Sequence, residues 1–532
     1  MNSGPSWTPL IGSRPVAQFE FKDIGAIVSK TIGTGWLFVL ILLALAVPTE
    51  AQVVSYQAPG ITASRDFQIW VNGQRVFTGQ AGSQRQGYYS FSTFDFSGSA
   101  TIKIKSLRAI KWLDLLPSSL NIDHFMVDEY TFEFTLEEPA DVTVLLNNDR
   151  NNALHLLTNK PETNQPVPGE EGVLFYKAGE TYDVGVLDLK DDQTLYIEGG
   201  ARLKGMIRVR DAKNVRILGR GMIDGTDNKS QGNGRFKDEP WRLIYMENAS
   251  QVKVAGITLY NSLKWTIHTY DCSDLEFDHI NIVNSDYGSD GIDISGCQRV
   301  KITNSFLRTN DDCVVLKSLS FAENSYYPNP RRQNPDVEEI LVEGCTLWNM
   351  PYGNCFEIGF ELRCSKVKNV IYRDCDVIMQ QGRGAVFSIH NSDNAVVENI
   401  LYDNIRVENA DQGNANKLFD LAILFSVWSY DRFEKAELNR KYRYNDTWDN
   451  LLPVLPGRAV FHSSHRGHIR NIRFHNIQVL DGKFPFSVIN GFDEDHLVEN
   501  VTFEDITVKG KRIASAEELK LVTRFAKDIQ IR

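Results

Sequence analysis

Residues 251–302 read QVKVAGITLYNSLKWTIHTYDCSDLEFDHINIVNSDYGSDGIDISGCQRVKI. A short segment of alternating polar and apolar residues occurs three times in this stretch, as QVKV at 251–254, DLEF at 274–277 and RVKI at 299–302. Successive side chains of a strand point to opposite faces, so the apolar positions of each segment share one face. Repetition at an interval of about 25 residues predicts a solenoid in which each repeat stacks on the next.

The pattern continues on both sides of this stretch, and many copies are followed by a second short strand. Further first strands are expected at 214–217, 339–342, 369–371, 395–400, 468–472 and 497–501, and second strands at 256–259, 279–282, 404–407, 476–479 and 505–508. We therefore predict an all-β chain whose residues 166–532 form a right-handed parallel β-helix. The exception is 514–525, which has helical periodicity and is expected to cap the open end of the solenoid.

The segment before the solenoid, 52–165, shows the pattern of a small antiparallel β-sandwich. FQIWV at 67–71 and VF at 76–77 flank Asn72-Gly73, a pair typical of tight hairpin turns. Its aromatic residues either bind sugar or pack in the core and against the next domain, and the sequence leaves both open.

The N-terminal segment, 1–51, has the features of a signal peptide. Residues 36–47 (WLFVLILLALAV) form an uncharged apolar run that is too short for a typical membrane span. Cleavage after Ala51 would leave a secreted protein, periplasmic or extracellular, with no stable membrane span. An uncleaved anchor is the alternative.

Composition limits the partners of the chain. Its 532 residues carry a formal net charge of −11, which argues against a nucleic-acid binder. The seven cysteines are odd in number and fall between 272 and 375 without a zinc-type spacing, so we expect buried free thiols. We predict no metal, no cofactor and a monomeric protein.

Three aspartates are the candidate catalytic residues. Asp290 lies 21 residues before Asp311, about one coil, and Asp312 follows directly. Stacked coils would bring these carboxylates together on one outer face, which requires a bend at Asp311-Asp312. Glycoside hydrolysis needs such a group, one carboxyl to protonate the leaving oxygen and another to activate water. The alternative is that they are turn aspartates or calcium ligands.

Around these aspartates the sequence resembles glycoside hydrolase family 28, the polygalacturonases and their relatives. SDGID at 289–293 is similar to the family's N-T-D-G-x-D, and NDDCVVLKS at 310–318 to its D-D-C segment. WTIH at 265–268 and GRGMIDG at 219–225 match two further segments. The resemblance implies an inverting hydrolase of a polysaccharide or oligosaccharide, with Asp311 or Asp312 as acid and the remaining carboxylates as base.

Two departures from the family pattern affect which sugar the protein is expected to bind. Asn354 replaces a usual histidine, and Val386-Phe387-Ser388 stands where an Arg-Ile-Lys segment binds the galacturonate carboxylate. A desolvated carboxylate needs a cationic partner, so these changes weaken the case for galacturonate. The expected substrate-binding residues are His268, Lys317, Asn354, Glu357, Arg383 and His390.

Other readings remain open at this point. The sandwich followed by a β-helix also resembles glycoside hydrolase family 49, the dextranases and isopullulanases, which cleave neutral α-glucans. Two insertions, 319–336 and 410–465, are expected to project near the carboxylates and shape specificity, and Arg331-Arg332 in the first is a possible substitute for the missing cations. A non-catalytic polysaccharide-binding β-helix and a polysaccharide lyase are the competing classes.

Overall fold

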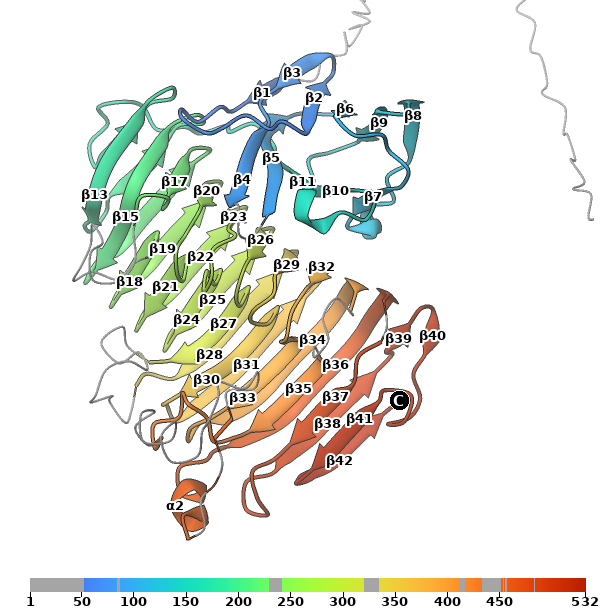
Figure 1. Cartoon of the computed structure of the whole chain (residues 1–532). Coiled ribbons are helices and arrows are strands. Elements are labelled where there is room, and N and C mark those ends of the chain that lie inside the picture. Colours follow the sequence, from blue (N-terminus) through green and yellow to red (C-terminus); the bar gives the residue numbers. More distant parts are fainter. Residues whose placement is uncertain are drawn as a thin grey trace, which may run out of the picture. The chain divides into compact units, whose positions relative to one another are not determined.

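The repeats form three columns of parallel strands, with each strand paired to the equivalent strand of the next coil (Figure 1). The computed structural model describes residues 52–83, 87–228, 242–319, 334–410, 417–432, 451, 452, 454, 457–482 and 484–532. Column 1 consists of β13 (Thr181–Leu189), β15 (Arg202–Arg210), β18 (Ile244–Glu247), β21 (Ile267–Tyr270), β24 (Ile292–Ser295), β27 (Val314–Ser318), β30 (Phe356–Leu362), β33 (Ala385–Asn391), β35 (Lys417–Ile423), β37 (Ser487–Asn490) and β41 (Leu521–Arg524).

The other two columns complete each coil. Column 2 consists of β12 (Val173–Tyr176), β14 (Thr194–Ile197), β16 (Lys213–Gly219), β19 (Ser250–Ala255), β22 (Ser273–Asp278), β25 (Gln298–Thr303), β28 (Val337–Glu343), β31 (Lys366–Arg373), β34 (Val396–Asn409), β36 (His468–Asp481), β38 (Val498–Glu504) and β42 (Ala526–Ile531). Column 3 consists of β17 (Met222–Asp224), β20 (Thr258–Tyr260), β23 (Asn281–Val283), β26 (Phe306–Thr309), β29 (Thr346–Asn349), β32 (Asp376–Gln380), the ends of β34 and β36, and β39 (Thr507–Val508). The predicted parallel β-helix is confirmed.

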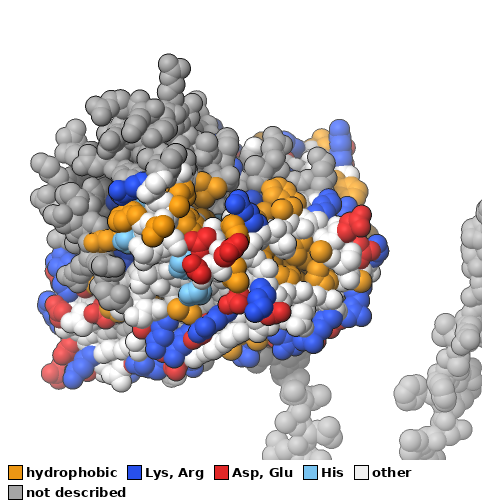
Figure 2. All heavy atoms as spheres, turned by 90° about the horizontal axis from the view of Figure 1, so that it is seen from below, with side chains coloured by type: hydrophobic (Ala, Val, Ile, Leu, Met, Phe, Trp, Pro, Cys, Tyr) orange, Lys and Arg blue, Asp and Glu red, His pale blue; other side chains and the backbone are white. Residues whose placement is uncertain are grey.

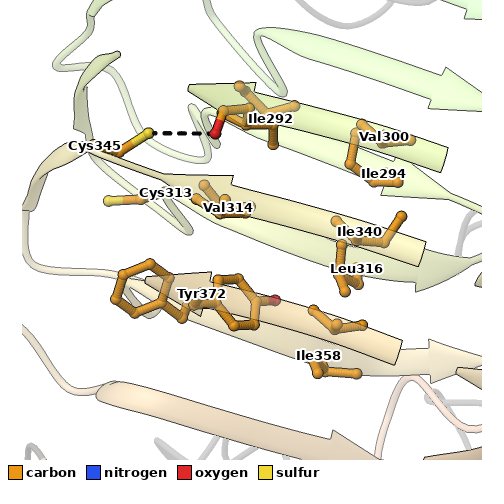
Figure 3. Close-up of a cluster of buried hydrophobic side chains, with 14 of the residues drawn as sticks. Ile292, Ile294, Val300, Cys313, Val314, Leu316, Ile340, Cys345, Ile358 and Tyr372 are labelled. Atoms are coloured by element: carbon orange, nitrogen blue, oxygen red, sulfur yellow. Dashed lines mark hydrogen bonds between the residues drawn. The ribbon is translucent and has the colours of Figure 1, made fainter. Parts of the chain in front are cut away.

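The core of the solenoid is built from rows of apolar side chains in register. Ile294 pairs with Leu316, and Leu316 with Ile358, so that equivalent side chains lie one above another (Figure 3). All three are fully buried. The seven cysteines are buried and free, as expected, and they belong to the core cluster of the solenoid, but each lies between strands rather than within one.

Asparagines occupy a left-handed position that recurs within the strands of column 2. Asn369, Asn399, Asn471 and Asn500 all adopt left-handed backbone, with φ between 53° and 58°. Their side chains form a ladder in which each amide donates to the preceding coil, as Asn500 Nδ2 does to Asn471 Oδ1 over 2.8 Å. Asparagine tolerates this backbone region better than most residues.

The first part of the described chain is a sandwich of a six-stranded and a five-stranded sheet. The six-stranded sheet contains β1 (Val53–Ser55), β4 (Gly79–Ser83), β5 (Gly87–Phe96), β7 (Leu113–Leu116), β10 (Val142–Leu146) and β11 (Leu154–Asn159). The five-stranded sheet contains β2 (Phe67–Val71), β3 (Gln74–Val76), β6 (Ala100–Ser106), β8 (His124–Asp128) and β9 (Thr131–Leu136). One pair, β5 with β11, is parallel, so this sheet is mixed rather than wholly antiparallel.

Column 3 packs against the sandwich. The Arg308 guanidinium of β26 lies 3.5 Å from the Tyr89 ring centroid, and Tyr89 and Trp348 are both buried in a cluster shared by the two parts. Arg308 Nη1 and the Tyr89 hydroxyl both donate to the Asn284 carbonyl, over 2.9 and 3.1 Å. Many sandwich aromatics therefore serve packing.

The outer surface carries charges of both signs. On the face in Figure 2, Lys and Arg side chains lie among Asp and Glu side chains and do not form a basic stripe. Pairs between coils account for part of this pattern, as with Arg470 and Glu398, 2.8 Å apart, and Arg473 and Glu504, 2.6 Å apart. Within the described residues, no helix is long and apolar enough to cross a membrane.

Two expectations for the C-terminal half were wrong. Residues 514–525 do not form a helix; they contain turns and β41, and with β42 they extend columns 1 and 2. The proposed insertion at 410–465 contains β35, a regular strand of column 1, followed later by the short helix α2 (Ala459–Ser463). In both places, the backbone groups of the strand pair with the preceding coil.

Candidate active site

The three aspartates lie in adjacent turns that precede strands of column 1. Asp290 comes two residues before β24, and Asp311 and Asp312 come just before β27. The turns are hydrogen-bonded to each other, because Gly291 N donates to Asp312 O over 2.8 Å and Asp311 N donates to Ser289 O over 3.3 Å. The register of the solenoid thus brings together residues that are 21 positions apart in sequence.

The backbone bends at Asp311-Asp312, and neighbouring side chains hold the bend. The Asp311 carbonyl accepts hydrogen bonds from Thr309 Oγ1 at 2.6 Å and Asn349 Nδ2 at 2.7 Å. Gly353 packs directly against it with a φ of 68°, and a Cβ there would lie 2.3 Å from Asp312 N. The next coil therefore has room for only a glycine at this point.

Asn354, which replaces the usual histidine, binds Asp312. Asp312 Oδ1 accepts from Asn354 N at 2.7 Å and from Asn354 Nδ2 at 3.0 Å. The Asn354 side-chain oxygen in turn accepts from Ala385 N at 2.7 Å. This residue therefore links the turn of β27 to the turn of β33 and fixes the orientation of one carboxylate.

A fourth aspartate, Asp293, lies beside the other three, and we call Asp290, Asp293, Asp311 and Asp312 the acidic cluster. Lys317 contacts two of its carboxylates. Its Nζ lies 3.5 Å from Asp290 Oδ2 and 3.2 Å from Asp293 Oδ1, and 4.0 Å from the Trp265 ring centroid. The Arg242 guanidinium lies 4.5 Å from the same ring. Two buried cations and one indole ring thus support the acidic cluster.

Burial and mutual repulsion perturb the titration of the cluster. Burial raises the pKa of Asp290 well above its ordinary value, and repulsion from Asp293 and Asp311 adds to the increase. Burial also raises the pKa of Asp312 well above its ordinary value, with added repulsion from Asp311 and Glu357. Burial raises the pKa of Asp293 to about 6, with Lys317 opposing the increase. Coupled carboxyls titrate as a group, so the cluster retains protons at a pH where isolated aspartates are ionised.

The other expected binding residues on column 1 form a chain of ionic contacts. Glu357 is fully buried and accepts from Ser388 Oγ, and its Oε1 lies 3.0 Å from His390 Nδ1. His390 Nε2 lies 3.1 Å from Asp420 Oδ2, which Lys417 Nζ also contacts. Burial opposes protonation, but Glu357 and Asp420 raise the pKa of His390 to about 10, so its imidazole is a cation at neutral pH.

His268 and Arg383 have contrasting environments. His268 is fully buried, pairs along the sheet with Asp293, and its ring lies 4.9 Å from that of Trp265. Burial lowers the pKa of His268, which keeps the imidazole neutral. Arg383 is exposed, and its guanidinium lies 5.3 Å from the Tyr352 ring centroid.

Some residues of this site were not predicted from the sequence, and others lie outside the described part. Asp293 and Trp265 occur in the segments that carried the family resemblance but were not singled out, and Arg242 had no sequence signal. Arg331 and Arg332 fall in 320–333, outside the described residues. No group of three or more described His, Cys, Asp or Glu side chains is arranged to hold a metal ion.

The strands that carry the aspartates also match a known family in sequence. Residues 189–415 match the sequence model of glycosyl hydrolases family 28, and this segment contains all three aspartates. The chain is a glycoside hydrolase, and its residues 189–415 are similar to family 28. Among similar proteins, exopolygalacturonase B of Aspergillus niger is 25% identical over 302 residues, which cover 44% of this chain and 67% of the relative. The exopolygalacturonase of Platanus acerifolia is 24% identical over 292 residues, covering 46% and 73%.

Among solved structures, Dex49A from Penicillium minioluteum shares the fold over nearly the whole length of this chain. The TM-score is 0.61 at 12% identity, covering 90% of this chain and 96% of Dex49A. At this identity the likeness establishes the fold alone.

Replacing Lys317 with methionine tests the electrostatics of the cluster. The ammonium lowers the pKa of Asp290 and Asp293, so its loss raises both further. A base must be ionised to act, and the acidic limb of the kcat/KM profile should therefore move to higher pH by roughly 1–3 units.

Lys253→Met is the matched control, since Lys253 pairs with Glu276 on column 2. An acidic limb that stays in place in K317M, with the control unchanged, would show that Lys317 does not control the ionisation of the cluster.

Proposed function

We propose that this protein hydrolyses O-glycosidic bonds of a pectin-like polysaccharide with inversion of configuration, using Asp290, Asp311 and Asp312. The observation that carries the proposal is the hydrogen-bonded pair of turns that brings these three carboxyl groups together. An inverting reaction requires an acid and a base to act in one displacement. The names of the relatives, exopolygalacturonases, support a galacturonan-like substrate.

The hydrogen bonds favour particular roles within the triad. Burial raises the pKa of Asp312 and Asp290, but two donors from Asn354 on one oxygen of Asp312, and the Lys317 ammonium beside Asp290, oppose that increase. Asp311 is the more exposed member of the Asp311-Asp312 pair. We assign Asp311 as the acid that protonates the glycosidic oxygen. Asp290 and Asp312 then take a proton from the water that attacks the anomeric carbon.

The second candidate function is hydrolysis of a neutral α-glucan. It is favoured by Ser388, which stands where a cation would bind a uronate and instead donates to the buried Glu357. The neighbouring His390 is held between the carboxylates of Glu357 and Asp420. Purified protein tested on polygalacturonan, rhamnogalacturonan, dextran and pullulan separates the two functions.

Asn substitution of each aspartate tests the triad. D290N, D311N and D312N should each reduce kcat on the preferred polysaccharide by about 10²–10⁴-fold, measured as release of reducing sugar. Asp274→Asn is the control, because Asp274 is exposed on β22 and its left-handed backbone suits asparagine. Near-normal cleavage by any of the three variants would remove that residue from the catalytic group.

We further propose that the protein is secreted after removal of residues 1–51. The support is the apolar run at 36–47, in a segment that lies outside the described residues. N-terminal sequencing of protein from the medium or periplasm should begin near Gln52. A mature protein that retains residues 36–47 would contradict cleavage.

A further inference from the structure

Two cations and two tyrosines form a continuous set of contacts beside the aspartates. The Lys264 ammonium lies 5.5 Å from the Tyr287 ring centroid, and the Arg383 guanidinium lies 5.3 Å from that of Tyr352. The two tyrosine rings meet edge to face with centroids 4.8 Å apart. We call these four residues the cation–tyrosine rim.

The rim spans the turn that carries Asp311 and Asp312. Its members precede β21, β24, β30 and β33, whereas Asp311 and Asp312 precede β27, the central strand of these five. At ~4.8 Å per coil, the four steps from β21 to β33 cover about 19 Å along the solenoid. The contact between Tyr287 and Tyr352 therefore joins the coils on either side of the one that carries Asp311 and Asp312.

Backbone contacts hold the rim close to the carboxylates. Gly353, which follows Tyr352, packs against Asp311 and Asp312. Gly288, which follows Tyr287, lies under Lys264, whose Nζ is 3.1 Å from the position a Cβ would take. Burial raises the pKa of Asp311, and Lys264 is near enough to oppose that increase.

The inner cations are not in a position to serve a ligand in the same way. Lys317 is 6% exposed and lies against Asp290 and Asp293, and Arg242 is also 6% exposed. Lys264 is half-buried, Arg383 is exposed, and 51% of the Tyr287 surface is accessible. A polyanion that approaches four aspartates needs accessible positive charge nearby, and the rim supplies it together with aromatic surface.

We propose that the cation–tyrosine rim is a binding site for acidic sugar residues, in which Lys264 and Arg383 bind carboxylates on the two sides of the scissile bond and the tyrosines contact the sugar rings. This rests on the proposed function. The rim would let the protein bind uronates without the cations that are absent from 386–388.

The test compares an oligogalacturonate with its fully methyl-esterified, uncharged form. For K264M, R383Q and the double variant, KM for the acidic oligomer should rise roughly tenfold per cation, because a charged hydrogen bond is lost. KM for the esterified oligomer and kcat for both should stay near the wild-type values. Lys527→Met is the control, since it removes an exposed charge from the last coil.

Calorimetric binding to D311N makes the test independent of cleavage. Adding K264M and R383Q to D311N should weaken oligogalacturonate binding, and this loss should shrink at high salt. Unchanged affinity, or equal loss for the acidic and esterified oligomers, overturns the rim as a carboxylate site. If the wild type cleaves neither oligomer while binding still depends on the rim, the proposed function fails and the rim stands.

Discussion

In-register hydrogen bonding between parallel coils is the constraint on which the rest of this structure depends. It places the Ile294, Leu316 and Ile358 side chains in one core row. It also joins the turn of Asp290 to the turn of Asp311 and Asp312, through Gly291 N and Asp312 O. A shift of one residue in either strand would turn core side chains outward and separate the carboxylates, so stability and the site share one cause.

The three columns of the solenoid have different surroundings, and this difference locates the site. Column 3 is covered by the sandwich through Tyr89, Arg308 and Trp348. Column 2 carries the asparagine ladder and ion pairs between coils. Column 1 has the acidic cluster at the start of its strands, where buried cations offset the cost of grouping carboxylates away from water.

Much of this arrangement could be predicted from the sequence because a solenoid converts sequence spacing into distance. The alternating segments predicted the coils, and the interval between Asp290 and Asp311 predicted that these two residues lie close together. Contacts that depend on side-chain direction were not accessible in this way. Trp265 and Lys317 lie two coils apart, and nothing in their spacing shows that the ammonium contacts the ring.

The missed strands have a similar explanation. Residues 417–423 form a strand after a long connection. The repeats were found by their regular spacing in the sequence, and the connection interrupts that spacing. Residues 514–525 have helical periodicity in the sequence. Residues 521–524 nevertheless form a strand, because they pair with Ser487–Asn490. In each case a non-local backbone partner outweighs local preference.

The central claim is that a general acid and a general base act in one displacement at the Asp290, Asp311 and Asp312 cluster. Proton NMR during the first minutes of hydrolysis, before mutarotation, measures the anomer that is released first. From an α-linked galacturonan the account predicts the β-anomer. First release of the α-anomer would contradict it, because retention requires a covalent intermediate on one of these carboxylates.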